Sequence, residues 1–145
     1  MKTAMSVLIA FLMAATVSAQ ENLPDDARNF VSRFEKAVMT HHYDSVMEYM
    51  DNEYMKLQYK KLLKKDQEQF IDEFFSGYED VVHSKGFTNT RLPDISAISF
   101  EKSRKLAEDE YEVMFRVLRV SGYAHYCTVM LRKYKGQWGF FGAMG

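Results

Sequence analysis

Cysteine and long apolar runs are scarce in this sequence. Cys127 is the one cysteine in 145 residues, so the chain cannot form an internal disulfide. A small exported domain without a disulfide has to be stabilised by its apolar core. After residue 19, no apolar run approaches the roughly twenty residues that a transmembrane helix needs. We therefore expect no membrane anchor in the mature protein.

An excess of charge of one sign is also missing. The formal net charge is −1 at pH 7. Binding to nucleic acid depends on many lysine and arginine contacts to phosphates, so a near-neutral chain has no general attraction for it. With two prolines, no internal repeat and no low-complexity linker, the sequence also gives no sign of a second domain. We predict no nucleic-acid partner.

The first 19 residues have the layout of a cleaved signal peptide. Lys2 supplies a positive charge, Val7–Ala15 form an apolar run, and Val17–Ala19 place small residues before the cleavage point. The alternative interpretation is a buried N-terminal helix. Gln20, rather than a cysteine, follows the cleavage point, which argues against a lipoprotein. We expect a soluble bacterial protein exported to the periplasm or the medium, with residues 20–145 forming a single domain.

Aromatic and methionine residues are abundant. The chain contains eleven phenylalanines, nine tyrosines and ten methionines. Such a composition supplies enough apolar side-chain volume for a packed core and excludes a disordered tail. The mature protein is therefore expected to be a globule stabilised by its aromatic core.

The first half of the mature chain has helical periodicity. Apolar residues recur three to four positions apart, as on one face of an amphipathic helix. We predict a first helix over Pro24–Thr40, a break at His41–Tyr43, and a short helix capped by Asp44 or Ser45. Two further helices are predicted over Glu53–Lys64 and Asp66–Ser84.

From Asp94 onward the pattern is that of strands. Apolar residues alternate or cluster, and turn residues separate the runs. The predicted strands are Ile95–Lys102, Tyr111–Val120, Tyr123–Tyr134 and Gln137–Ala143, and Arg104–Glu110 is predicted as a polar connector. Helices followed by an antiparallel meander indicate an α+β fold, with the N-terminal helices packed on a curved four-stranded antiparallel sheet.

This order of elements resembles the NTF2-like (cystatin-like cone) superfamily. The resemblance depends on the opening amphipathic helix, the short helix after the break, and the final hairpin with its aromatic return strand Gln137–Phe140. It implies a sheet that curls around the long helix and leaves a conical pocket, here with aromatic and methionine side chains on its walls. In some members an Asp/His or Tyr/Asp pair in the pocket performs acid–base chemistry. Others bind ligands or partners, so the fold alone does not settle function.

The candidate catalytic residues are His125 and Asp44. Strand alternation places His125 on one face with Cys127, Val129 and Leu131, from which it could project into a pocket. The alternative is a histidine satisfied in the core. His125 and Cys127 are two positions apart on a strand, too far for a hydrogen-bonded nucleophile and base. The spacing of the histidines supports no metal site, and no cofactor is predicted.

The candidate ligand-binding residues are Tyr126, Arg116, Tyr49 and Phe74. Arg116 shares a strand face with Met114 and Leu118, where it could pair with an anionic ligand. Alternatively, that face is the solvent side of the sheet and the aromatic residues belong to the core.

The sequence is compatible with two functions. The first is an exported module that binds a small molecule or a protein, with a homodimer through the outer sheet face, where Met114, Leu118 and Val120 would form an apolar patch. The alternative is a cofactor-free isomerase, dehydratase or hydrolase that uses acid–base residues of the pocket.

Overall fold

The protein is described here by a computed structural model covering residues 23–53, 64–79 and 87–144. In these segments, the helices before the sheet are α2 (Asp25–Met39), α3 (Tyr43–Met47) and α5 (Lys64–Phe74). Two short strands, β1 (Gly77–Glu79) and β2 (Phe87–Thr88), and a 3-10 turn (Leu92–Asp94) come next. The four long strands are β3 (Ile95–Ala107), β4 (Glu110–Arg119), β5 (Ala124–Tyr134) and β6 (Gln137–Met144). No helix of the described segments is long and apolar enough to cross a membrane.

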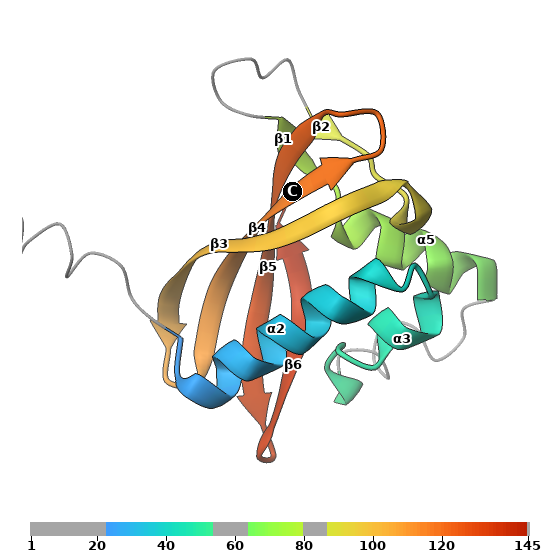
Figure 1. Cartoon of the computed structure of the whole chain (residues 1–145). Coiled ribbons are helices and arrows are strands. Elements are labelled where there is room, and N and C mark those ends of the chain that lie inside the picture. Colours follow the sequence, from blue (N-terminus) through green and yellow to red (C-terminus); the bar gives the residue numbers. More distant parts are fainter. Residues whose placement is uncertain (1–22, 54–63, 80–86, 145) are drawn as a thin grey trace, which may run out of the picture.

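Helix α2 forms where the sequence predicts it. Pro24 stands at its N-cap, and Asp25 and Asp26 occupy the first turn, where negative charge complements the helix dipole. The helix buries one face, made of Ala27, Phe30, Val31, Phe34 and Val38. His41 ends it in a left-handed conformation with φ of 58°. Figure 1 shows α2 lying across one face of the curved sheet, with α3 and α5 beside it.

The sheet is an antiparallel meander in which β1 and β6 both pair with the same edge of β5. Strands β3, β4, β5 and β6 pair in sequence order. Strand β4 runs along one edge of β5. On the other edge, β1 pairs with the beginning of β5 and β6 pairs with the rest of it. Helices followed by this curved antiparallel sheet confirm the predicted α+β class (Figure 1).

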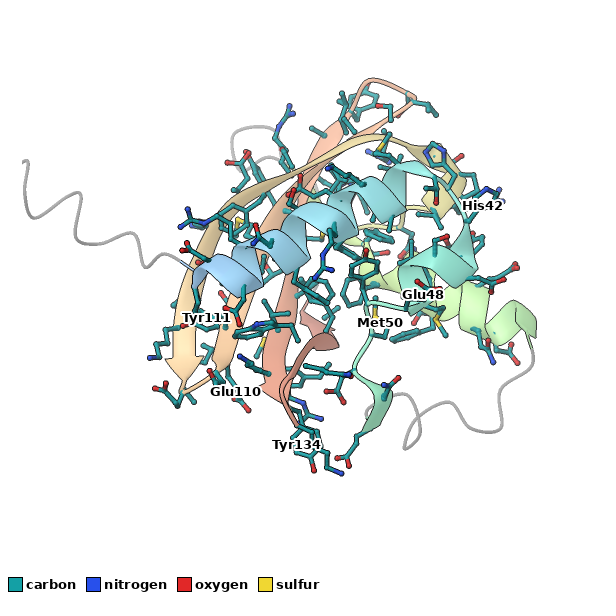
Figure 2. All side chains as sticks on the ribbon, turned by 60° about the horizontal axis from the view of Figure 1, so that its bottom comes forward. His42, Glu48, Met50, Glu110, Tyr111 and Tyr134 are labelled. Atoms are coloured by element: carbon teal, nitrogen blue, oxygen red, sulfur yellow. The ribbon has the colours of Figure 1, made fainter. Side chains whose placement is uncertain are left out.

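Strands β4 and β5 each have an inner face and an outer face. On β4, buried residues alternate with more exposed ones, and the buried set is Tyr111, Val113, Phe115 and Val117. On β5 the buried set is His125, Cys127, Val129 and Leu131, as alternation predicts. We call the buried side, which packs on the helices, the inner face and the opposite side the outer face. Figure 2 shows side chains filling the space between α2 and the sheet.

The core is an aromatic cluster on the inner face. Phe34 of α2 lies at its centre, with ring centroids 4.6 Å from Phe140, 5.5 Å from Phe115 and 6.1 Å from Phe75. Phe74 adds edge-on contacts to Phe34 and Phe140. Such tilted and edge-on pairs stabilise a core beyond the area they bury.

Several details of the sequence prediction are corrected. The helix predicted over Asp66–Ser84 ends at Phe74, because the chain turns at Phe75 and becomes strand β1 at Gly77. There the backbone runs so close to β5 that a Cβ on Gly77 would overlap the carbonyl oxygen of Tyr126. Strands β1 and β2 were not predicted.

The predicted connector Arg104–Glu110 is also wrong. Strand β3 continues to Ala107, and β4 begins at Glu110. Arg104 donates a hydrogen bond of 2.8 Å to Glu112 of β4, so polar side chains support the strand pairing here. The short helix begins at Tyr43, just before the predicted caps. Most of the helix predicted over Glu53–Lys64 lies outside the described residues.

Candidate functional site

The four predicted ligand-binding residues lie on opposite sides of the sheet. Tyr49 and Phe74 belong to the aromatic cluster, where each contacts the ring of Phe34. Arg116 and Tyr126 are paired neighbours on the outer face of β4 and β5. The sheet therefore separates these residues into two pairs, and they do not line one pocket.

His125 lies in the core at the junction of three elements. Its side chain is fully buried on β5. The Nε2 atom lies 2.6 Å from the carbonyl oxygen of Phe75 and 3.4 Å from the hydroxyl of Thr90. A carbonyl oxygen only accepts, so Nε2 carries the proton and donates it. This bond ties β5 to the end of α5.

Asp44, the other catalytic candidate, lies in the first turn of α3 and is exposed. It is not part of the core junction that holds His125, so the two candidates do not form an acid–base pair. Cys127 is buried, and burial raises the pKa of its thiol to about 12. At neutral pH this thiol stays protonated and is a poor nucleophile.

A tyrosine–aspartate pair joins α3 to α5. The Tyr43 hydroxyl donates a hydrogen bond of 2.9 Å to Oδ1 of Asp72, which also accepts one of 2.8 Å from the backbone N–H of Leu92. Partial burial, and then the bond to Asp72, raise the pKa of Tyr43 to about 12. The phenol therefore acts as a hydrogen-bond donor that connects these two helices. A catalytic base would need a lowered pKa instead.

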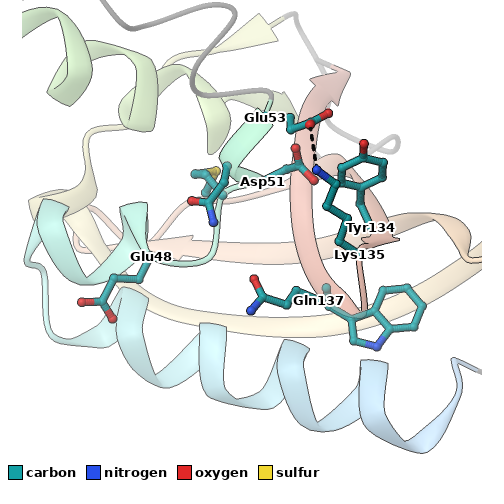
Figure 3. A pocket seen from close by; sticks show the side chains of 9 residues that line it. Glu48, Asp51, Glu53, Tyr134, Lys135 and Gln137 are labelled. Carbon is teal, nitrogen blue, oxygen red and sulfur yellow. Dashed lines mark ion pairs between the residues drawn. The ribbon is translucent and has the colours of Figure 1, made fainter.

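The candidate site is a polar pocket beside the β5–β6 hairpin. It has a volume of about 230 Å³. One wall is the segment after α3, and the other is the turn between the two strands (Figure 3). The side chains that line it are Glu48, Met50, Asp51, Asn52, Glu53, Tyr134, Lys135, Gln137 and Trp138.

The first wall is held against β6 by backbone hydrogen bonds. Asp51 N–H donates to the Phe140 carbonyl at 2.7 Å, and Phe140 N–H donates to the Tyr49 carbonyl at 2.9 Å. Residues 49–51 thus lie along β6 like a short additional strand, with a parallel bridge at Met50. Gly139 permits this approach, because a Cβ there would lie 2.9 Å from the Cα of Asp51.

An ion pair with a buried carboxylate fixes the position of the same wall. Arg132 of β5 donates from Nη2 to Oδ1 of Asp51 at 2.9 Å and from Nε to Oδ2 at 3.1 Å. The Asp51 side chain is 5% exposed. The guanidinium also lies over the rings of Tyr134 and Phe141, at 5.2 and 4.9 Å from their centroids. The two-point hydrogen bond, together with the guanidinium's position over two aromatic rings, fixes both partners geometrically.

The rest of the pocket is polar and open to water. Lys135 and Glu53 form a loose ion pair of 3.8 Å, drawn as the dashed line in Figure 3. Glu48, Asn52 and Gln137 are exposed at its rim. Asp51 is neutralised by Arg132 and Glu53 is paired with Lys135, whereas the described residues give Glu48 no ion-pair partner. The pocket therefore offers a ligand the Glu48 carboxylate, which accepts hydrogen bonds, and the amides of Asn52 and Gln137, which both donate and accept.

The sequence did not reveal this pocket. Asp51 and Arg132 are 81 residues apart and belong to no motif. A glycine between the aromatic residues Trp138 and Phe140 was the one available signal of a close backbone approach. Metal binding has no candidate among the described residues, since they contain no group of three His, Cys, Asp or Glu side chains that could hold an ion.

Comparison with known proteins gives a single kind of result. No family model and no curated protein matches the chain. Among solved structures, one described as an NTF2-like transpeptidase from Campylobacter jejuni is similar, with 15% sequence identity and a TM-score of 0.38. The match covers 80% of this chain and 94% of that one. The element order and the sheet of this chain themselves show its α+β fold.

Proposed function

We propose that this chain is an exported binding module that holds a small polar molecule in the pocket beside the β5–β6 hairpin. The observation that carries this proposal is a pocket of about 230 Å³ whose wall is fixed by the buried Asp51–Arg132 pair. A fixed wall supports binding because little side-chain freedom is lost when the ligand enters.

The chemistry of the lining indicates the class of ligand. Carboxylates accept hydrogen bonds, and the amides of Asn52 and Gln137 both donate and accept. A molecule that carries hydroxyl or amine groups satisfies this set, whereas an apolar molecule would leave it unpaired. The ligand we propose is therefore small, polar and rich in hydrogen-bond donors.

Binding is favoured over acid–base catalysis by the positions of the candidate residues. The Nε2 proton of His125 is engaged by the Phe75 carbonyl, and Asp44 is exposed on α3. Neither lines the pocket. An enzyme of the predicted type would need such groups within hydrogen-bond reach of the substrate.

Export is part of the same proposal and has a direct test. Mass spectrometry of the protein recovered from the periplasm or the medium should give a chain that begins at Gln20. A recovered chain that retains residues 1–19 would contradict cleavage of the predicted signal.

Ligand binding is tested by NMR with a library of small fragments bearing hydroxyl or amine groups. We expect hits that shift the Asn52 and Gln137 side-chain amides and the Trp138 indole. Gln137→Trp should fill the pocket and abolish these shifts. Asn89→Trp, an equally large substitution at an exposed residue away from the pocket, should leave them unchanged. Hits that map elsewhere, or that survive Gln137→Trp, would remove the proposal.

A further inference from the structure

A second concave surface lies between α2 and the edge of the sheet. This groove has a volume of about 400 Å³ and is lined by Ser32, Glu35, Lys36, Met39, Thr40 and Ile98. It shares no lining residue with the polar pocket. Its walls are apolar at Met39 and Ile98, and Met39 remains 39% exposed.

Strand β3, which forms one side of the groove, is an edge strand. In the sheet order it stands last, paired with β4 on one side. Among the described residues, no strand pairs with its other edge. A strand edge of this kind presents backbone donors and acceptors to any extended chain that comes alongside.

The backbone of β3 faces outward next to the groove. The Phe100 N–H donates to Oε1 of Glu35 at 3.2 Å, so this N–H points away from β4. In an antiparallel ladder, residues two positions apart face the same way. Ile98 and Phe100 pair with Val117 and Phe115 without a bulge between them, so the backbone groups of Ile98 face outward as well. On either side of Ile98 the outward groups are already bonded, since the Ile95 carbonyl lies 2.7 Å from His41 Nε2 and the Phe100 N–H is bonded to Glu35. Ile98 lines the groove, so the part of the edge that opens into it is the backbone of Ile98.

Glu35 adds a charge to the groove. Its carboxyl group is half-buried, and this burial raises its pKa, against the effect of the bond from Phe100. Within the described segments it has no cationic partner, and its second oxygen, Oε2, accepts no hydrogen bond. A half-buried carboxylate without a cation is costly, and an incoming cation would offset that cost.

We propose that this groove binds an extended peptide segment of another protein, which adds as a strand to the outer edge of β3 and places a basic side chain against Glu35. Strand addition takes its affinity from main-chain hydrogen bonds and its specificity from pockets for alternate side chains. Here the main-chain partner is the edge at Ile98, and Glu35 selects the basic side chain. The apolar surface of Met39 contacts a neighbouring side chain of the peptide.

The remainder of β3 limits addition to this stretch. Register shifts interrupt the strand between Ile95 and Ala97, beyond Phe100 and again beyond Lys105. Lys102, Arg104 and Lys105 follow, all with exposed side chains. Bulges and charges of this kind discourage unspecific pairing along an edge. The docking site is therefore short and confined to the part of the edge that α2 flanks.

The test uses three synthetic peptides with the full mature protein. The first is a seven-residue peptide of alternating valine and threonine with a central lysine. The second carries glutamate in place of the lysine, and the third is the lysine peptide with N-methylated backbone amides, which cannot pair as a strand. Fluorescence anisotropy gives the affinities, and NMR shifts of the β3 amides locate the binding.

We expect the lysine peptide to bind at least about tenfold more tightly than the other two, the factor that one charge-assisted hydrogen bond supplies. Glu35→Gln should remove the preference for the lysine peptide over the glutamate peptide, and Glu35→Lys should reverse it. The control Glu108→Gln removes an exposed carboxylate at the β3–β4 turn and should change nothing. Thermal melting checks that each variant is folded.

Three results would overturn the proposal. The first is equal binding, or no binding, of the lysine and glutamate peptides to the unmodified protein. The second is unaltered binding of the N-methylated peptide. The third is a dimer in sedimentation that shields the β3 amides and is not displaced by the lysine peptide, which would make a second copy of this chain the occupant. All three results are measured on the unmodified protein, so none depends on whether a variant folds.

Discussion

At the scale of single residues, Asp51 is a buried carboxylate held by a two-point ion pair. Its side chain is 5% exposed and receives both hydrogen bonds of Arg132. Surface ion pairs contribute little, because water screens them and two long side chains lose freedom. A buried, two-point pair behaves differently, since removing one partner leaves the other charge partly buried and uncompensated.

Asp51→Ala should therefore lower the free energy of unfolding by about 2–3 kcal/mol. Urea denaturation followed by fluorescence measures the change. Glu108→Ala, at the exposed end of the Lys105–Glu108 pair, is the matched control and should cost less than about 0.5 kcal/mol. Equal effects of the two substitutions would contradict the role given to Asp51.

The raised pKa of Tyr43 predicts a loss of stability at alkaline pH. In the unfolded chain this phenol loses its proton near pH 10, but in the folded protein it does so at about 12. The folded state holds the proton over that interval, so its stability is complete below pH 10 and falls as the pH rises toward 12. Denaturation midpoints measured from pH 8 to 12 should show this fall.

Tyr43→Phe isolates the contribution of this residue, because other groups also titrate at high pH. The variant should be less stable than the wild type at pH 8, and the difference should shrink above pH 10. In Asp72→Asn, the charge that disfavours the phenolate is gone while an acceptor oxygen remains, so the pKa of Tyr43 in the folded protein should drop and the alkaline loss of stability should become smaller and end at a lower pH. A constant difference between the wild type and Tyr43→Phe would refute the assignment.

At the scale of elements, the segment 49–51 depends on a missing side chain in β6. A Cβ on Gly139 would lie 2.9 Å from the Asp51 Cα and 3.0 Å from its nitrogen. Gly142 of the same strand has room, since its nearest contact would be Met130 at 3.8 Å. The two glycines therefore form a matched pair for substitution.

Gly139→Ala should destabilise the protein by about 1–3 kcal/mol, because the backbone has to move apart. Gly142→Ala should be nearly neutral. Differential scanning calorimetry compares the two, and NMR shifts of Asn52 and Trp138 report whether the pocket wall has moved. A neutral Gly139→Ala would mean that residues 49–51 can shift without cost.

Elements that depend on local sequence patterns could be predicted, whereas features that depend on contacts between distant residues could not. Helix α2 and the inner faces of β4 and β5 follow from local periodicity, which each segment carries by itself. Helical periodicity also continued past Phe74, but the chain leaves the helix because the backbone of Gly77 packs on β5. The pocket depends on Asp51 meeting Arg132, a contact between distant residues that no local pattern encodes.

At the scale of the whole molecule, the outer face of the sheet supports a proposed homodimer. Met114 and Leu118 are partly exposed on this face, beside Arg116 and its neighbour Tyr126, and Val120 is 68% exposed. Apolar side chains gathered on one face favour burial against a second copy. A two-fold contact would place the same residues on both sides of the interface.

Sedimentation across a range of concentrations should reveal this dimer, and Leu118→Lys should shift the protein to monomer. Leu106→Lys changes another exposed leucine at the far end of β3 and should have no effect. A wild-type protein that stays monomeric at every concentration would exclude the proposed interface.

The place of Phe140 in the core has a consequence for the order in which the chain acquires its structure. This ring contacts Phe30, Phe34, Phe74 and Phe115, so residues from both halves of the sequence converge on it. A growing chain that has not yet reached β6 lacks the ring on which the others pack. We expect such a chain to remain unfolded while it is being synthesised, with tertiary structure appearing only after the hairpin strand has been released.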